Sequence, residues 1–279
     1  MAQQANTLSA NPAKVVEVNW WQAIVLGLVQ GLTEFIPVSS SAHLNITHFL
    51  LGQNSRQLPF DVLLSVGTIL ALAWYFFSDW KALITDRRQR WLLSLVIISC
   101  IPAVLVAKFS PIDRWESTSK FFFSPFYNGL WMIIGGALLL VADFVGAKKR
   151  AINNIKNGDA IIIGASQALA LIPGFSRSGS TIMAGLFLGI KREDAARFSF
   201  LMSLPISIGA VVFKARDLHT TGLGAQPVPA LLGVLVSGLS GFWAISFLLR
   251  YLATRGMTPF FLWRLVVGLA AMIIFFSRR

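Results

Sequence analysis

Long apolar runs recur along the chain, and they dictate that most of it folds in lipid. A helix needs about 20 consecutive apolar residues to cross a bilayer. Six runs reach or approach that length: Phe60–Phe77, Trp91–Phe109, Phe126–Val145, Ala195–Phe213, Pro229–Leu249 and Phe260–Phe276. Charged residues make up only 13% of the sequence, which is about half of what a soluble chain uses. The sequence therefore predicts an all-α polytopic membrane protein with six transmembrane helices.

The formal net charge is +12, yet the placement of the basic residues argues against nucleic acid as a partner. Lys and Arg gather in loops between the apolar runs, as in Lys81–Arg90 and Gly146–Gly158, and short basic loops normally face the cytoplasm. We expect both termini on the opposite side, although the Arg278–Arg279 pair argues mildly against this orientation. Residues 1–18 are polar and are predicted to form a flexible arm before a single membrane domain, 19–279.

Two further apolar regions, Trp20–Leu51 and Ala160–Ile190, are each interrupted by proline and a cluster of hydroxyl side chains. The breaks lie at Pro37 and at Pro173. Irregular backbone at membrane depth is tolerated only where protein buries it or where it lines a wet cavity. Each region therefore predicts a re-entrant hairpin of two half-length helices, and the two hairpins are expected to enter from opposite faces.

The two broken regions resemble each other in sequence, which predicts an inverted-topology repeat. Gln30 aligns with Gln167 at one offset, and a one-residue slip then aligns Ser40 with Ser176. Each repeat holds one hairpin and three spans, and an odd number of crossings inverts the second copy. The alternative is chance similarity between apolar helices. The predicted repeats run from about 19 to 146 and from about 158 to 279.

The first break carries side chains that a lipid-facing helix would exclude. Glu34 is a carboxylate within an apolar segment, which marks a functional site by default, and Gln30 shares its helix face. Three serines and a histidine follow: Ser39, Ser40, Ser41 and His43. One serine can be explained as the cap of the next half-helix, but capping does not account for Glu34 and His43.

The second break combines small hydroxyl residues with one cation, a pattern that suits a phosphate. Its candidate binding residues are Gly174, Ser176, Arg177, Ser178 and Thr181. Free N–H groups at a helix N-terminus bind anions, and the guanidinium of Arg177 matches phosphate oxygens. A buried ion pair between Arg177 and Glu34 is the structural alternative. If the breaks meet, they form a phosphate site beside acid–base groups, where a carboxylate commonly carries Mg²⁺ or Ca²⁺.

The two breaks read QGLTEFIPVSSSAHL (30–44) and PGFSRSGST (173–181). Together they resemble the two signature regions of the undecaprenyl-diphosphate phosphatase family, the bacitracin-resistance membrane type, and the resemblance extends over nearly the whole chain after residue 18. It implies hydrolysis of undecaprenyl diphosphate to undecaprenyl phosphate and inorganic phosphate, which recycles the lipid carrier of peptidoglycan synthesis and confers bacitracin resistance. It also implies a multi-pass protein of the bacterial inner membrane with an active site facing the periplasm.

The resemblance motivates a set of residue roles. The catalytic set is Glu34, Ser40, His43 and Arg177. Ser40 would attack the terminal phosphorus or position the attacking water, His43 would exchange protons with it, and Arg177 would hold the diphosphate. The substrate-binding set is Gln30, Ser39, Ser41, Gly174, Ser176, Ser178 and Thr181. A divalent cation would be held by Glu34 and Gln30; the family motif allows Glu or Gln at position 30, and Gln30 would contribute a neutral carbonyl oxygen.

A second class of function fits the same frame. Inverted repeats with broken helices are transporter architecture, and a transporter or flippase of polyprenyl phosphates would bind the same groups without hydrolysing them. Phosphate release by the purified protein separates the two classes. A structural scaffold would leave Glu34, His43 and Arg177 without a purpose. The sequence predicts lipids as partners and no nucleic acid, and it leaves the oligomeric state open, a homodimer included.

Overall fold

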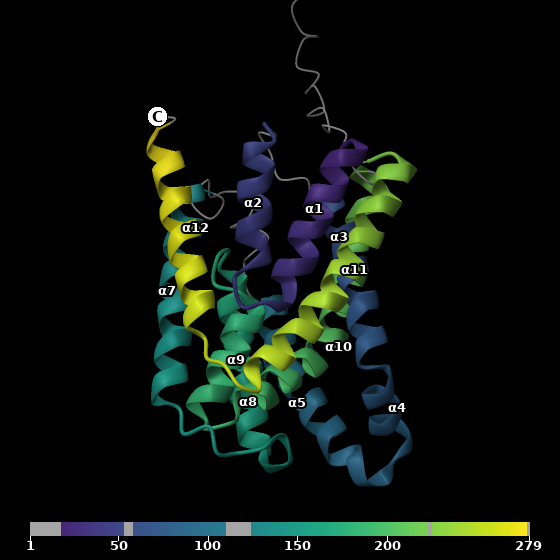
Figure 1. Cartoon of the computed structure of the whole chain (residues 1–279). Helices are drawn as coiled ribbons and strands as arrows, with labels where there is room; N and C mark the ends of the chain where they lie inside the picture. The colour runs from purple at the N-terminus through teal and green to yellow at the C-terminus, as the bar shows by residue number, and fades with distance from the viewer. Residues whose placement is uncertain (1–17, 53–57, 110–123, 222–224, 278–279) are drawn as a thin grey trace, which may run out of the picture.

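The computed structural model describes residues 18–52, 58–109, 124–221 and 225–277, and within these ranges the chain forms eleven α-helices and three short 3-10 turns (Figure 1). The helices are α1 Trp20–Phe35, α2 Ser40–Leu50, α3 Leu58–Tyr75, α4 Phe77–Thr85, α5 Arg90–Phe109, α7 Pro125–Val145, α8 Asn157–Ser166, α9 Arg177–Phe187, α10 Arg192–Thr221, α11 Pro227–Leu252 and α12 Thr258–Ser277. The 3-10 turns are η1 Arg87–Gln89, η2 Ile152–Asn154 and η3 Gln167–Leu171. The predicted N-terminal arm lies outside the described residues, except for Val18.

Five helices, α5, α7, α10, α11 and α12, are long and apolar enough to cross a membrane. They coincide with five of the six predicted runs. A sixth span results if α3 and α4, which are bent by 63° at a short break, are counted as one. The helical, multi-pass class predicted from composition is therefore confirmed for the described residues.

The predicted span Phe60–Phe77 ends earlier than expected. The helix stops before Phe76, whose backbone (φ −95°, ψ 18°) leaves helical geometry, and the chain then turns into α4. Asp79 of α4 forms an ion pair with Arg197 of α10. The segment around Lys81, expected to be part of a loop, is therefore helical and connected to the rest of the bundle.

Each broken region consists of two short helices whose connection lies in the middle of the molecule. Helices α1 and α2 extend from the face where α12 ends, whereas α8 and α9 occupy the opposite half (Figure 1). Helix α8 tightens into η3 before its turn. Helix α1 packs against α11 and α3, and α9 packs against α7 and α10. This packing brings the two turns toward each other.

Small residues let α1 and α11 approach closely. A Cβ added to Gly27 would lie 2.7 Å from the carbonyl oxygen of Gly233, and one added to Gly31 would lie 2.4 Å from that of Ser237. Close packing of small residues is a main source of helix association in lipid. The same contact fixes the part of α1 that carries Glu34 against α11.

The backbone gives the register of the two breaks. Ser39 and Ser176 are the N-cap residues of α2 and α9, and both have left-handed backbone angles (φ 77° and 78°). They are separated by the same interval as the two glutamines aligned in the sequence, so one offset holds through both breaks without the expected slip. Ser40 therefore corresponds to Arg177 in the structure, and not to Ser176.

Candidate active site

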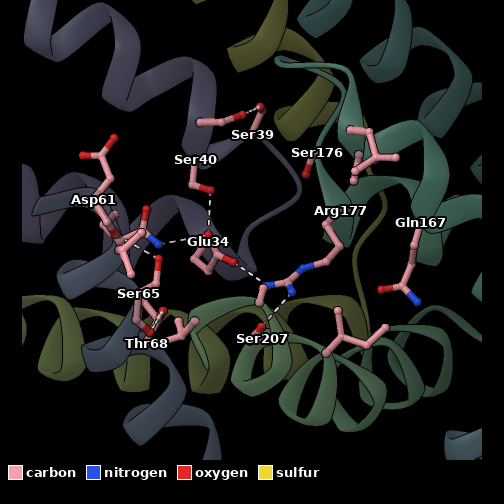
Figure 2. A pocket seen from close by; sticks show the side chains of 18 of the residues that line it. Glu34, Ser39, Ser40, Asp61, Ser65, Thr68, Gln167, Ser176, Arg177 and Ser207 are labelled. Carbon is pink, nitrogen blue, oxygen red and sulfur yellow. Dashed lines mark hydrogen bonds and ion pairs between the residues drawn. The ribbon is translucent and has the colours of Figure 1, made fainter. Parts of the chain in front are cut away.

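The two breaks meet at a single carboxylate. Ser40, the first residue of α2, donates a hydrogen bond to Oε2 of Glu34 at 2.6 Å. Arg177, the first residue of α9, reaches Oε1 of Glu34 at 2.5 Å. Gln30, one turn earlier on α1, donates to Oε2 at 3.1 Å. Figure 2 shows Glu34 between the serine and the guanidinium, so the ion pair considered from the sequence is present within a larger cluster.

Two strained serines start the half-helices that point at this carboxylate. A non-glycine residue at positive φ costs on the order of 1–3 kcal/mol, and such strain gathers at functional sites. Ser176 caps α9, because its Oγ accepts from the N–H of Gly179 at 3.1 Å. Ser39 makes no side-chain cap bond, and its Oγ lies 3.3 Å from that of Ser41. The positive ends of both helices are thereby directed at Glu34.

The carboxylate borders a cavity of about 370 Å³, which is within the range of small-molecule sites. Its lining includes predicted site residues from both breaks: Gln30, Glu34, Ser39, Ser40, Ser41, Ser176 and Arg177. Other polar residues come from α3, η3 and α10: Asp61, Ser65, Thr68, Gln167, Ser207 and Lys214. Apolar residues of several helices make up the rest, among them Leu44, Val62, Leu171, Ile206 and Val211. The cavity can hold a polar head group beside an aliphatic chain.

Four predicted site residues, His43, Gly174, Ser178 and Thr181, do not line this cavity. Gly174 has φ 103° and lets the second break turn tightly. The hydroxyl of Ser178 is 3.5 Å from the carbonyl oxygen of Ile36, and that of Thr181 is close to α10. These three residues hold the two breaks and their neighbours together, and their substrate-binding roles stay predictions.

His43 faces α12 and not the cavity. The Nε1–H of Trp263 donates to Nε2 of His43 at 2.9 Å, so the imidazole carries its proton on Nδ1, which donates to the carbonyl oxygen of Ser39 at 2.8 Å. The two rings stack with centroids 6.1 Å apart. Both ring nitrogens are engaged in this arrangement. The geometry favours His43 as a support for the strained backbone at Ser39, and proton exchange with Ser40 stays a prediction.

Trp263→Phe tests this support. The substitution keeps an aromatic ring beside His43 but removes one hydrogen bond of about 1 kcal/mol. We therefore expect kcat to fall about fivefold, with KM little changed and the pH profile of kcat keeping its shape. His43→Ala should lower kcat further than Trp263→Phe does. If His43→Ala instead removes one limb of the pH profile, then His43 exchanges protons during turnover and the supporting role is insufficient.

Arg264 of α12 ties both breaks to α7 from outside the cavity. Its side chain is fully buried. The guanidinium donates to five carbonyl oxygens, those of Pro37 (3.3 Å), Trp131 (3.4 Å), Met132 (2.7 Å), Gly174 (3.0 Å) and Phe175 (2.9 Å). The signal for this residue in the sequence was an arginine inside an apolar run. The buried cation also adds positive potential near the meeting point of the breaks.

Several polar residues of the cavity lining were not assigned to the site from the sequence, and Ser207 and Asp61 are two of them. Ser207 accepts a hydrogen bond from Nη1 of Arg177 at 2.7 Å, and its signal in the sequence was the polar interruption around Pro205. Asp61 lines the cavity and lies 2.9 Å from Nε2 of His48. Neither belongs to a break, so the motifs could not reveal them.

The cavity offers oxygen ligands that fit a divalent cation arriving with a phosphate. Mg²⁺ typically binds one or two carboxylates together with substrate phosphates. Glu34 supplies a carboxylate, and rotation of the Gln30 amide would supply a carbonyl oxygen. Within the part of the chain that the structure describes, no group of three or more His, Cys, Asp and Glu side chains could hold a metal by itself. The ligand roles of Glu34 and Gln30 stay predictions.

Known proteins match this chain over a range that includes both breaks. The family model described as bacitracin resistance protein BacA matches residues 23–270. A protein of Gemmatimonas aurantiaca named undecaprenyl-diphosphatase is 42% identical over 273 residues, which cover 92% of this chain and 98% of its own. Proteins of the same name from Pelobacter propionicus (42% over 263 residues, 90% and 95% covered) and Pelotomaculum thermopropionicum (39% over 268 residues, 93% and 98% covered) are similarly related.

Proposed function

The chain belongs to the bacitracin resistance protein BacA family, and from that premise we propose that it is an undecaprenyl-diphosphate phosphatase of the bacterial inner membrane. It removes the terminal phosphate and leaves undecaprenyl phosphate, which recycles the lipid carrier for peptidoglycan synthesis. One observation carries the proposal at the atomic level: Ser40, Glu34 and Arg177 are joined beside a cavity that both polar and apolar residues line.

Ser40 is the proposed nucleophile. Its hydroxyl already donates to Glu34, so Glu34 is placed to take the proton while Ser40 Oγ forms a bond to the terminal phosphorus. The bond from that phosphorus to the bridging oxygen breaks, and its electron pair leaves with undecaprenyl phosphate, which receives the proton. Water then hydrolyses the phosphoserine, which releases inorganic phosphate and restores the serine hydroxyl.

Arg177 is proposed to hold the terminal phosphate during transfer. Its guanidinium is anchored to Ser207 through Nη1, while Nη2 pairs with Glu34, so a phosphate would compete with Glu34 for one arm of the fork. The N-termini of α2 and α9 add positive potential at the same place. Electrostatic stabilisation of this kind supplies most of the catalysis in phosphoryl transfer.

The shape and charge of the protein support a site that faces the periplasm. The cavity lining follows α10 from Ser207 to Lys214, toward the face where α11 begins and α12 ends (Figure 1). The basic loops around Arg88 and Lys149 lie at the opposite face, which the positive-inside rule places in the cytoplasm. Counting α3 and α4 as one span then gives six crossings and two re-entrant hairpins of opposite orientation.

A divalent cation, Mg²⁺ or Ca²⁺, is proposed to bind together with the diphosphate near Glu34 and Gln30. When bound, it neutralises charge on the phosphate oxygens. The need for such charge follows from the site itself, because the positive charge of Arg177 is already balanced by Glu34.

The decisive experiment measures inorganic phosphate released from a C55 polyprenyl diphosphate by the purified protein in detergent. We expect release that EDTA abolishes and that Mg²⁺ or Ca²⁺ restores. Ser40→Ala, assayed in parallel, should release almost none; if it retains most of the activity, an activated water attacks in place of Ser40. Binding of the lipid without phosphate release under any divalent ion would reject the phosphatase and favour the carrier.

A further inference from the structure

Gln167 carries an unpaired acceptor at the cavity wall. The residue begins η3, is only 5% exposed and belongs to the cavity lining. Its Oε1 has no hydrogen-bond partner among the described residues. Leaving a buried carbonyl oxygen without a donor is costly, and nearly all such groups in native proteins are satisfied by protein, water or a functional ligand.

The neighbours of the amide nitrogen determine which end of the amide faces the cavity. Nε2 of Gln167 donates to the carbonyl oxygen of Ser99 at 3.4 Å and lies 3.8 Å from the sulfur of Met202. A flipped amide would place Oε1 against the Ser99 carbonyl, so that two acceptors faced each other. Oε1 is therefore directed to the cavity side, and Figure 2 shows Gln167 across Arg177 from Glu34.

Gln30, the corresponding glutamine of the first break, has a different hydrogen-bond arrangement. Gln30 bonds through its amide nitrogen to Glu34, four residues later. Four residues after Gln167 the chain has Leu171, an apolar residue of the cavity lining. The second break thus presents a neutral acceptor where the first presents a carboxylate cluster, and water or a bound ligand can supply the donor to Gln167 on the cavity side.

We propose that Gln167 contacts the substrate directly, its Oε1 accepting a hydrogen bond from the hydroxyl of a monoprotonated terminal phosphate held by Arg177. This inference rests on the proposed phosphatase function and deepens it, because it names the protonation state that the site binds. A fully ionised phosphate offers only acceptor oxygens and would meet Oε1 with repulsion. A phosphate monoester gives up its last proton near pH 6, so protonated and ionised forms are both present around neutrality.

Gln167→Met removes the acceptor while keeping the length of the side chain and an apolar contact for Met202. The test compares the KM of the variant and of the wild type for the C55 diphosphate at pH 6 and at pH 8. At pH 6 we expect about a tenfold higher KM in the variant, as for one hydrogen bond to a charged group. At pH 8 the two KM values should be nearly equal, because the terminal phosphate then lacks the proton.

The ionisable groups around the cavity cannot mimic this result, since they are the same in both proteins and cancel from the ratio of KM values. They are Glu34 of α1, His48 of α2, Asp61 of α3, Arg177 of α9 and Lys214 of α10. Thr68→Val is the matched control: it removes a hydroxyl from the same cavity, but that hydroxyl already donates to the carbonyl oxygen of Ser65 at 2.9 Å. Its KM should equal that of the wild type at both pH values.

A second measurement uses only the wild-type protein and needs no turnover. Two farnesyl methylenediphosphonates, one with a terminal P–OH and one with P–CH₃ in its place, have the same charge at pH 6 and similar size. We expect the P–OH compound to bind about tenfold more tightly, measured by its shift of Tm in detergent. Equal binding of the two compounds, or a KM ratio for Gln167→Met that does not depend on pH, would overturn the proposal. Phosphate release by the wild type would still stand in that case, whereas its absence would reject the phosphatase function itself.

Discussion

Glu34→Gln is expected to lower kcat about a thousandfold, with a much smaller change in KM when Mg²⁺ is saturating. The amide cannot take the proton of Ser40, and the loss of a general base typically reduces the rate by about 10²–10⁴. Neutralising the carboxylate frees Arg177 for the phosphate, while it weakens the proposed cation site. Saturating Mg²⁺ offsets the second effect, so the change in KM should be small beside the loss in kcat. A loss confined to kcat identifies an interaction that matters in the transition state. Phosphate release gives kcat and KM, and the shift of Tm with a methylenediphosphonate gives binding independently.

Asp61→Asn is the matched control for this prediction. It also neutralises a carboxylate of the cavity, but Asp61 lies beside His48 and takes no part in the cluster formed by Ser40 and Arg177. Most of the activity should therefore remain. If Glu34→Gln raises KM and leaves kcat intact, Glu34 binds substrate or cation and is not the proton acceptor.

Arg264→Met should cause the largest loss of stability of any substitution discussed. The guanidinium donates to five carbonyl oxygens, and each lost bond costs about 1 kcal/mol or more. The sum, roughly 5 kcal/mol, is comparable with the whole stability of many proteins. Because three of these carbonyls belong to the breaks, activity should disappear together with the fold. The Tm of the purified variant in detergent, with phosphate release by any folded fraction, checks this.

Two further substitutions test whether the placement of the Arg264 guanidinium matters, and not only the presence of an arginine. Gly135→Ala keeps the arginine but adds a Cβ that would lie 2.5 Å from Nη2 of Arg264, so activity should fall as the guanidinium is displaced. Arg250→Met is the control, because Arg250 is exposed and, among the described residues, hydrogen-bonds within its own helix, to the carbonyl oxygen of Ser246. Its Tm should match the wild type. A wild-type Tm and kcat for Arg264→Met would show that helix packing alone holds the breaks together.

Helix positions could be predicted from the sequence where lipid alone decides them. The run Phe126–Val145 became α7, Pro125–Val145, because an uninterrupted apolar segment has few alternatives to a helix in a membrane. Helix α4 could not be predicted, since the bend at Phe76 and the contact between Asp79 and Arg197 depend on a helix more than a hundred residues away. The correspondence between Ser39 and Ser176 likewise follows from their backbone angles and not from matching residues.

The candidate site was predictable in its chemistry but not in its full membership. Glu34, Ser40 and Arg177 meet as the hypothesis of joined breaks required. The direction of His43 did not follow from its spacing to Ser40, because Trp263, far along the chain, engages its ring.

Local composition was therefore enough to reveal a membrane protein, the approximate ends of its spans and the two polar breaks that meet at Glu34. Backbone groups without hydrogen bonds and isolated charges are each costly in lipid. Because this cost applies to individual residues, its effect can be recognised in the sequence. The arrangement of the helices decided which of those polar groups touch. Contacts such as Arg177 with Ser207, or Arg264 with the carbonyls of both breaks, depend on ångström-scale packing of distant helices.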